Sequence, residues 1–194
     1  MQSKKIVLAT NSEIRRTIAS RFSLDIQCVS PDINEDELKT KFNHLSPQDM
    51  CYELAKAKSL SITHYPDEII LGCDQICLLE NKVFSKPITI EKAIEQLNEL
   101  NGKTHKLIGH YVFSKNNEVL LSEQVICEMN MRALTNDEII AYVNLDEPFF
   151  SCGAYKFEGN GYTLFNSVIG SLEAINGLPL KELYEKLNEQ IQSN

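Results

Sequence analysis

The sequence predicts an α/β fold in which a mixed, mostly elongated β-sheet is flanked by helices. Apolar runs typical of strands alternate along the chain with segments whose apolar residues recur every three or four positions, as they do on helices. Two apolar runs in the middle, at 105–113 and 119–131, flank a polar turn and predict an antiparallel hairpin. The length of 194 residues, of which 24% are charged, predicts a single domain over 1–194.

Local signals mark the elements in the first half of the chain. A β-branched run ends before Asn11, and Ser12 is a natural N-cap before apolar residues at four-residue spacing. Ser46 and Pro47 begin a second helix, because proline is favoured in the first helical turn. The acidic segment between these helices predicts a mobile loop. The expected elements are a strand at 5–10, a helix at 13–22, a strand at 26–29, a loop at 30–43, a helix at 47–64 and a strand at 68–79.

The second half of the chain carries signals of the same kind. Pro87 forces an extended residue before it and so places Lys86 on a rigid backbone. Gly102 is a helix stop, and a capping box begins at Thr135. Glycines at 153–161 permit close approach of the backbone to a ligand. The expected elements are a helix at 89–100, the hairpin, a helix after 135, a strand and loop at 153–161, and a last helix that follows 177–179 and continues through 187.

Asp74 and Gln75 interrupt the otherwise apolar strand at 68–79. An ionised carboxylate that is removed from water without a partner loses several kcal/mol of solvation or shifts its pKa. We therefore expect Asp74 to face a pocket that contains a cation or a substrate. The alternative is a structural ion pair between Asp74 and a neighbouring lysine or arginine.

Charge and composition argue against several classes of protein. The formal net charge of −8 disfavours a general nucleic-acid or membrane-surface binder, and no run of about 18 apolar residues predicts a membrane span. The first apolar run is too short for a signal peptide, and the six cysteines form no CxxC pair. We therefore expect a cytoplasmic protein whose partner is a small molecule.

Cations and carboxylates suited to phosphoryl chemistry recur along the chain. Lysine and arginine neutralise phosphate oxygens, whereas carboxylates hold a hard divalent cation or take a proton from water. Two of the arginines stand in the first turn of the helix after Ser12, where a bound anion would offset their positive charge. The GxGxxG and GxxxxGK nucleotide fingerprints are absent. The candidates are Arg15, Arg16, Lys58, Lys86, Glu35, Asp74 and Glu158.

Seven short stretches of the sequence occur in a characteristic order. They are Leu8–Arg16, Pro31–Glu35, Leu54–Lys58, Asp74-Gln75 followed by Lys86-Pro87, Asn101–His105, Gly153–Tyr155 and Gly177–Leu180. In this order they resemble the motifs of the Maf family of nucleoside triphosphate pyrophosphatases over nearly the whole chain. Asn34 departs from the family pattern, in which Asp is usual, and Ser59 replaces an Ala. The resemblance implies the Maf and ITPase-like fold.

The resemblance also implies an activity, the hydrolysis of a nucleotide between its α- and β-phosphates. It implies that Asp74 is the proton acceptor and that Glu35 and Asp74 lie where a divalent cation, magnesium or manganese, is bound. It further implies a homodimer. The implied triphosphate-binding residues are Ser12, Arg15, Arg16, Lys58 and Lys86.

Three residues bear on the choice of base. Gln75 and Glu158 resemble the residues found at these positions in the branch of the family that acts on 7-methyl-GTP. In the branch that acts on dTTP and UTP, Thr and Gln are usual at these two positions. Glu158 could accept hydrogen bonds from the N1–H and the exocyclic amine of guanine. Ile14 corresponds to a wall of the base pocket, where the 7-methyl-GTP branch often has Trp.

Alternative interpretations remain open from the sequence. The chain could be a dTTP or UTP pyrophosphatase of the same family, or a non-catalytic nucleotide-binding regulator of cell division. Glu158 could pair with a surface lysine, and Lys58 could belong to the solvated side of its helix. His105 is expected to be a turn or supporting residue rather than a base.

Overall fold

The computed structural model describes residues 5–193, which divide into two compact units. Unit 1 is formed by the described parts of Met1–Asp74, Gly109–Val125 and Gly177–Asn194, and unit 2 by Gln75–Ile108 and Ile126–Asn176. Unit 1 contains β1 (Ile6–Ala9), α1 (Glu13–Ser20), β2 (Ile26–Val29), α2 (Glu35–Lys41), α3 (Pro47–Leu60) and α7 (Leu180–Gln192). Unit 2 contains β4 (Lys82–Phe84), α4 (Ile90–Leu100), α5 (Asn136–Asp146), η1 (Cys152–Ala154), η2 (Gly161–Leu164), β7 (Phe165–Ile169) and α6 (Leu172–Ile175).

Three longer strands contribute residues to both units: β3 (Ile69–Leu79), β5 (Thr104–Lys115) and β6 (Glu118–Met131). The strands of the described chain pair in the order β2-β1-β3-β5-β6-β7, and β4 pairs with β3. β1 is parallel to β2 and β3, whereas the β3–β4 and β6–β7 pairs are antiparallel. The predicted α/β class with a mixed sheet is confirmed, and the single domain over 1–194 stays a prediction.

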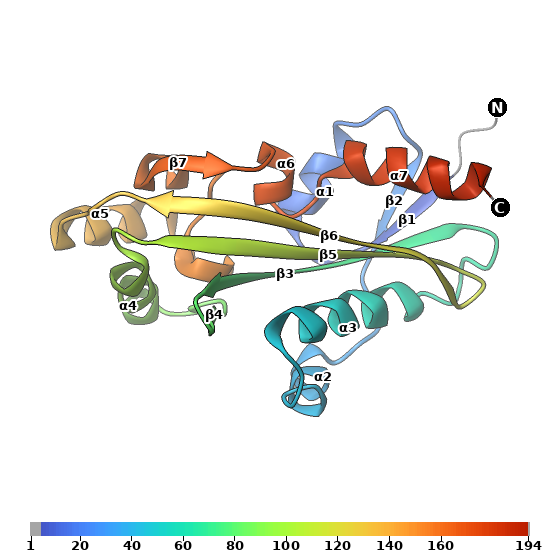
Figure 1. The fold of residues 1–194 in the computed structure, drawn as a ribbon, viewed down its shortest axis with the longest axis horizontal. Coiled ribbons are helices and arrows are strands. Elements are labelled where there is room, and N and C mark those ends of the chain that lie inside the picture. The colour runs from blue at the N-terminus through green and yellow to red at the C-terminus, as the bar shows by residue number, and fades with distance from the viewer. Residues whose placement is uncertain (1–4, 194) are drawn as a thin grey trace. The chain divides into compact units, whose positions relative to one another are not determined.

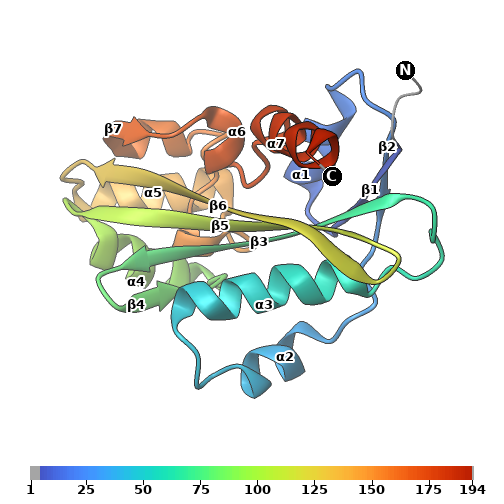
Figure 2. The same cartoon turned by 45° about the vertical axis from the view of Figure 1, so that its right-hand side comes forward.

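In unit 1, alternate residues of β1 face opposite sides of the sheet. Ile6 and Leu8 belong to a buried cluster with apolar residues of α1 and α7, whereas Val7 packs with Ile62, which follows α3. Figures 1 and 2 show α3 on one side of β1 and β3, and α1 with α7 on the other. A Cβ atom at Gly72 would lie 2.1 Å from the Ala55 carbonyl oxygen, so only glycine lets α3 lie this close to β3.

The loop predicted at 30–43 is wrong for Glu35–Lys41, which form α2. The Asn34 side chain caps this helix by accepting from the backbone N–H groups of Asp36 and Glu37. Acidic residues in the first turn and lysines in the last complement the helix dipole. The acidic stretch is therefore a capped helix, and Asn34 has a structural role that its amide performs as well as a carboxylate would.

The hairpin and the starts of α1 and α3 agree with the predictions, but these helices end at Ser20 and Leu60 rather than at residues 22 and 64. Asn116 and Asn117, with φ angles of 52° and 64°, form the two-residue turn between β5 and β6, a conformation that asparagine tolerates. Thr135 forms the predicted capping box at the start of α5. Within residues 5–193, no helix combines the length and apolarity needed to cross a membrane.

The strand predicted within 153–161 is wrong, and the strand of this region is β7, which pairs with β6. Gly153 and Ala154 have φ angles of 75° and 59°, which are incompatible with an extended strand. Both residues lie instead in the short helix η1, which is irregular at Gly153.

His105 provides a test of pH-dependent stability in unit 2. Its ring is buried, its Nε2 lies 2.9 Å from the Tyr155 hydroxyl, and burial lowers its pKa from 6.5 to about 4. In the unfolded chain the His105 ring takes up a proton near pH 6.5, whereas in the folded protein it stays neutral until the pH approaches 4. The stability that neutral His105 contributes is therefore fully present above pH 6.5 and is lost as the pH falls toward 4. From pH 7 to pH 5 the free energy of unfolding should fall by about 2 kcal/mol from this group.

Urea unfolding at pH 7, 6 and 5 measures this slope. His105→Gln should remove the contribution, whereas His64→Gln, at an exposed position, should leave the slope of the parent protein. Equal slopes for the parent and His105→Gln would contradict the assignment.

Candidate active site

Lys58 joins the two acids predicted at the centre of the site. Its Nζ lies 2.7 Å from Asp74 Oδ1 and 3.1 Å from Glu35 Oε1. α3 supplies the lysine, β3 supplies Asp74, and Glu35 is the first residue of α2. The Lys58 side chain is 9% exposed, so its interpretation as a solvated surface residue is wrong. Asp74 thus forms an ion pair with a lysine, which was the structural alternative to a catalytic role. Its partner, Lys58, is itself a predicted site residue.

Burial by itself lowers the pKa of Lys58, but the negative charges of Asp74 and Glu35 outweigh it, so the pKa is raised above its ordinary value. The lysine therefore stays protonated at neutral pH. A fixed positive charge held by two carboxylates is a group that can bind phosphate oxygens.

The start of α1 is arranged around Thr10. The Ser12 backbone N–H donates to Thr10 Oγ1 at 3.0 Å, and Arg16 Nη2 donates to the Thr10 carbonyl oxygen at 2.6 Å. Ser12 occupies the predicted N-cap position, but its side chain makes no capping hydrogen bond. The helix N-terminus thus combines a partial positive charge with a hydroxyl that does not cap the helix.

Arg15 is anchored to backbone carbonyl groups. Its Nε donates to the Gly177 oxygen at 2.8 Å, and its Nη1 donates to the Cys73 oxygen at 3.1 Å. The second bond reaches the residue directly before Asp74 on β3. Ile14, the predicted base-pocket wall, is half-buried and packs against the apolar cluster of unit 1.

Cys51 and His110 are neighbours of Asp74 that the sequence did not reveal. Burial raises the pKa of the Cys51 thiol, and so does the Asp74 carboxylate, which accepts a hydrogen bond from this thiol. Burial lowers the pKa of His110, and the charges of Asp74 and Asp49 partly offset this. The sequence held no signal for either residue, because only the packing of α3 and β5 brings them to this carboxylate.

Unit 2 holds the other three predicted residues, Gln75, Lys86 and Glu158. Gln75 Nε2 donates to the Ala174 carbonyl oxygen of α6 at 2.9 Å, which fixes the orientation of its amide. Lys86 is exposed. The Ser85 carbonyl oxygen before it accepts from Gln96 of α4, and the Ile88 N–H donates to the Phe149 carbonyl oxygen.

Glu158 is exposed and lies in a turn between α5 and η2. A Cβ atom at Gly159 would lie 2.8 Å from Asp146 Oδ2, and one at Gly161 would lie 2.3 Å from the Lys156 carbonyl oxygen. At these two glycines the backbone therefore approaches other atoms of the protein itself.

The donor set of unit 1 can be compared with the needs of a divalent cation. No group of three or more His, Cys, Asp or Glu side chains that could hold a metal occurs within residues 5–193. Glu35 and Asp74 supply carboxylate oxygens, and magnesium commonly takes one or two protein carboxylates together with water and substrate phosphates. The pair therefore fits a cation that is bound jointly by protein and nucleotide.

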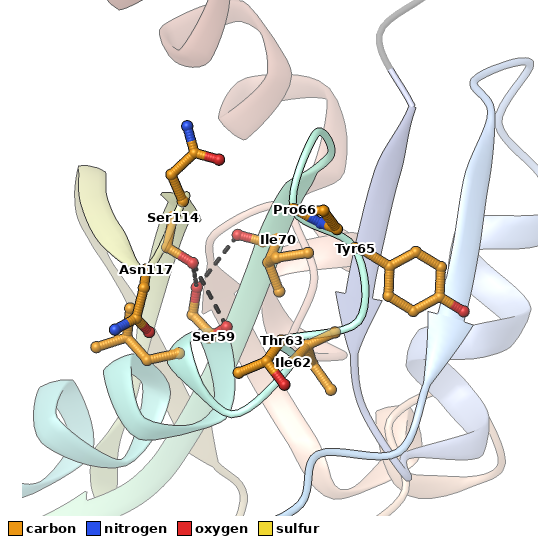
Figure 3. A pocket seen from close by; sticks show the side chains of 10 residues that line it. Ser59, Ile62, Thr63, Tyr65, Pro66, Ile70, Ser114 and Asn117 are labelled. Atoms are coloured by element: carbon orange, nitrogen blue, oxygen red, sulfur yellow. Dashed lines mark hydrogen bonds between the residues drawn. The ribbon is translucent and has the colours of Figure 1, made fainter.

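A separate pocket of about 210 Å³ lies in unit 1, between the end of α3 and the β5–β6 turn. Figure 3 shows Ser59 among the lining residues, where its Oγ lies 2.6 Å from Ser114 Oγ and donates to the Ile70 carbonyl oxygen. None of the predicted site residues lines this pocket.

Known proteins are similar to this chain over almost its whole length. Residues 5–190 match the family model described as Maf-like protein. A protein named nucleoside triphosphate pyrophosphatase, from Legionella pneumophila subsp. pneumophila strain Philadelphia 1, is 36% identical over 188 residues, which cover 96% of this chain and 94% of the relative. A protein named 7-methyl-GTP pyrophosphatase from Aliivibrio fischeri is 36% identical, with 98% of this chain and 97% of the relative covered.

A second protein named 7-methyl-GTP pyrophosphatase, from Bdellovibrio bacteriovorus, is 35% identical, with 94% and 95% of the two chains covered. The solved structure of the Staphylococcus aureus Ham1 protein is similar in fold, with a TM-score of 0.51, 16% identity, and 94% and 98% of the two chains covered. The relatives' names agree with the predicted class of enzyme. The chain belongs to the Maf-like protein family, as its seven motifs predicted.

Proposed function

We propose that this protein hydrolyses nucleoside triphosphates between the α- and β-phosphates and that its preferred substrate is 7-methyl-GTP. The single observation that carries the proposal is the cluster in which Lys58 binds both Glu35 and Asp74. Such a cluster supplies a fixed cation for phosphate and a carboxylate for a water molecule in one place. The names of the similar proteins support both the reaction and the substrate.

Asp74 is proposed to accept the proton of the attacking water. The water oxygen forms a bond to the α-phosphorus, and the bond from this phosphorus to the bridging oxygen breaks. The electron pair leaves with diphosphate, and the nucleoside monophosphate remains. The Lys58 ion pair and the thiol of Cys51 orient the carboxylate for this role.

The triphosphate is proposed to bind to Ser12, Arg15, Arg16, Lys58 and Lys86. The N-terminus of α1 favours an anion. Arg15 and Arg16 donate to neutral backbone carbonyl groups, which hold the guanidinium groups in place and leave their positive charge available to phosphate. Lys86 adds a positive charge from a turn that Gln96 and Phe149 support.

Nucleoside triphosphate pyrophosphatases of this kind generally need a divalent metal. Glu35 and Asp74 would hold magnesium or manganese together with the substrate phosphates. When bound, such an ion stabilises the charge that develops on the leaving diphosphate. The resemblance further predicts a homodimer and a cytoplasmic location.

Base choice is proposed to depend on Glu158, with Gln75 and Ile14 as further contacts. The Glu158 carboxylate can accept from both the N1–H and the exocyclic amine of a guanine base. A uracil or thymine base presents one N–H at its corresponding edge and leaves a carboxylate oxygen unpaired.

Diphosphate release from 7-methyl-GTP, GTP, dTTP, UTP and CTP, with magnesium or manganese, tests the proposal. Glu158→Gln should lower kcat/KM for 7-methyl-GTP by about 10- to 100-fold, because an amide retains one acceptor and adds a donor facing the base. Glu147→Gln, at an exposed acid of the same unit, is the matched control.

Each outcome distinguishes a different alternative. Selective turnover of dTTP or UTP would keep the reaction and overturn the assignment of Glu158. Nucleotide binding without turnover of any substrate would favour a regulatory binding protein instead.

A further inference from the structure

The turn that carries Glu158 is closed by one carbonyl group. The Lys156 oxygen accepts from the backbone N–H groups of Gly159, at 3.1 Å, and Gly161, at 3.0 Å. Glu158 lies inside this turn, and its side chain is exposed. The backbone of the turn therefore sets the point from which the Glu158 side chain extends and the region that its carboxylate can reach.

Both ends of the turn are fastened to α5. The Lys156 N–H donates to the Tyr142 hydroxyl oxygen at 2.9 Å. At the other end, Asp146 accepts from the Asn160 backbone N–H at 2.8 Å and from Asn160 Nδ2 at 2.6 Å. The carboxylate thus binds backbone and side chain of one residue through its two oxygens.

The two attachment points belong to the same face of α5. Tyr142 and Asp146 are four residues apart, the spacing that places side chains together on a helix. Burial raises the pKa of Tyr142, and so does the negative charge of the nearby Asp146 carboxylate. The hydroxyl that accepts from Lys156 and the carboxylate that accepts from Asn160 therefore lie close together on one helix face.

The support beneath the two attachments is rigid. α5 begins with a complete capping box and packs against α4, and Ile139 and Val143 are fully buried. Asp146 itself is half-buried and Asn160 is exposed. Loss of the Asp146 attachment would therefore release the turn while leaving the core contacts of α5 in place.

We infer that Asp146 is a positioning residue that sets base selectivity by fastening the Asn160 end of the turn and so fixing where the Glu158 carboxylate stands. The inference rests on the proposed function, in which Glu158 contacts the base. It adds a residue that does not touch the nucleotide, on a helix that carries none of the predicted site residues.

The test compares Asp146→Ala with Asp146→Asn, which keeps one oxygen acceptor, and with Asn144→Ala, an exposed polar residue of the same helix. The ratio of kcat/KM for 7-methyl-GTP to that for UTP is measured for each. Asp146→Ala should reduce this ratio by about tenfold, mainly through a higher KM, with partial rescue in Asp146→Asn. Asn144→Ala should match the parent protein.

A double-mutant cycle with Glu158→Ala shows whether Asp146 acts through Glu158. In the Glu158→Ala background, Asp146→Ala should cause no further loss of selectivity. Hydrogen exchange provides a second readout, in which Asp146→Ala should accelerate exchange of the Asn160 amide while the amides of α5 keep their protection.

The outcomes separate the inference from the proposed function. If Glu158→Ala lowers the ratio and Asp146→Ala does not, the positioning role is overturned and the base contact stands. If Glu158→Ala leaves the ratio unchanged, the base contact fails, and the positioning role fails with it. If Asp146→Ala lowers the ratio equally in the parent protein and in the Glu158→Ala variant, the positioning role is also overturned.

Discussion

Asp74→Asn should lower kcat for diphosphate release by about 10³-fold. The amide keeps an oxygen that can accept from Lys58 Nζ, which lies 2.7 Å from Asp74 Oδ1, but it cannot take a proton from water at neutral pH. Nucleotide affinity should change far less than turnover, because the proposed phosphate contacts are retained. Single-turnover assays measure the chemical step, and calorimetry with the inactive variant measures binding.

Asp67→Asn is the matched control, since Asp67 is an exposed acid shortly before β3. It should retain the turnover of the parent protein. Turnover by Asp74→Asn within tenfold of the parent would contradict the role of Asp74 as proton acceptor and would leave it as a structural partner of Lys58.

Lys58→Met should reduce both stability and activity. It replaces a buried ammonium group with an apolar side chain of similar length and leaves Glu35 and Asp74 without their shared cation. The free energy of unfolding should fall by about 3 kcal/mol, discounted for the partial exposure of Glu35. Diphosphate release should fall by at least about 100-fold, because a phosphate contact and the orientation of Asp74 are lost together.

Lys56→Met controls for the loss of a lysine from the same helix. Lys56 is more exposed and forms a surface pair with Glu53 at 3.6 Å, so its removal should cost less than about 1 kcal/mol. Urea unfolding compares the two variants, and Lys58→Arg should recover part of the stability by restoring the charge. Equal losses in Lys56→Met and Lys58→Met would show that the buried cluster adds nothing beyond a surface pair.

The predictions that the structure confirms depend on short-range signals. The capping box at Thr135 and the Pro-containing first turn after Ser46 mark the starts of α5 and α3. The apolar run around Asp74 marks β3, in which Asp74 and Gln75 are among the few residues that are not fully buried. In each case residues close in sequence determine the backbone conformation, so no knowledge of distant contacts is needed.

The predictions that failed concern segments whose local signals were ambiguous. The acids at 35–37 indicated a solvated loop, but they lie in the first turn of a helix that Asn34 caps. The glycines at 153 and 161 indicated a strand and a ligand-facing loop, but positive φ angles at Gly153 and Ala154 exclude the strand. Glycine permits several conformations, and only its neighbours in the fold select one.

The family, the α/β class and the candidate residues could be predicted without a structure, because ordered motifs and apolar periodicity are properties of the chain. Only the tertiary structure showed that Lys58 lies between Glu35 and Asp74, that Cys51 and His110 adjoin Asp74, and that Asp146 fastens the turn of Glu158. These contacts join residues on different secondary-structure elements. Their distances are set by the packing of those elements, which a single sequence does not contain.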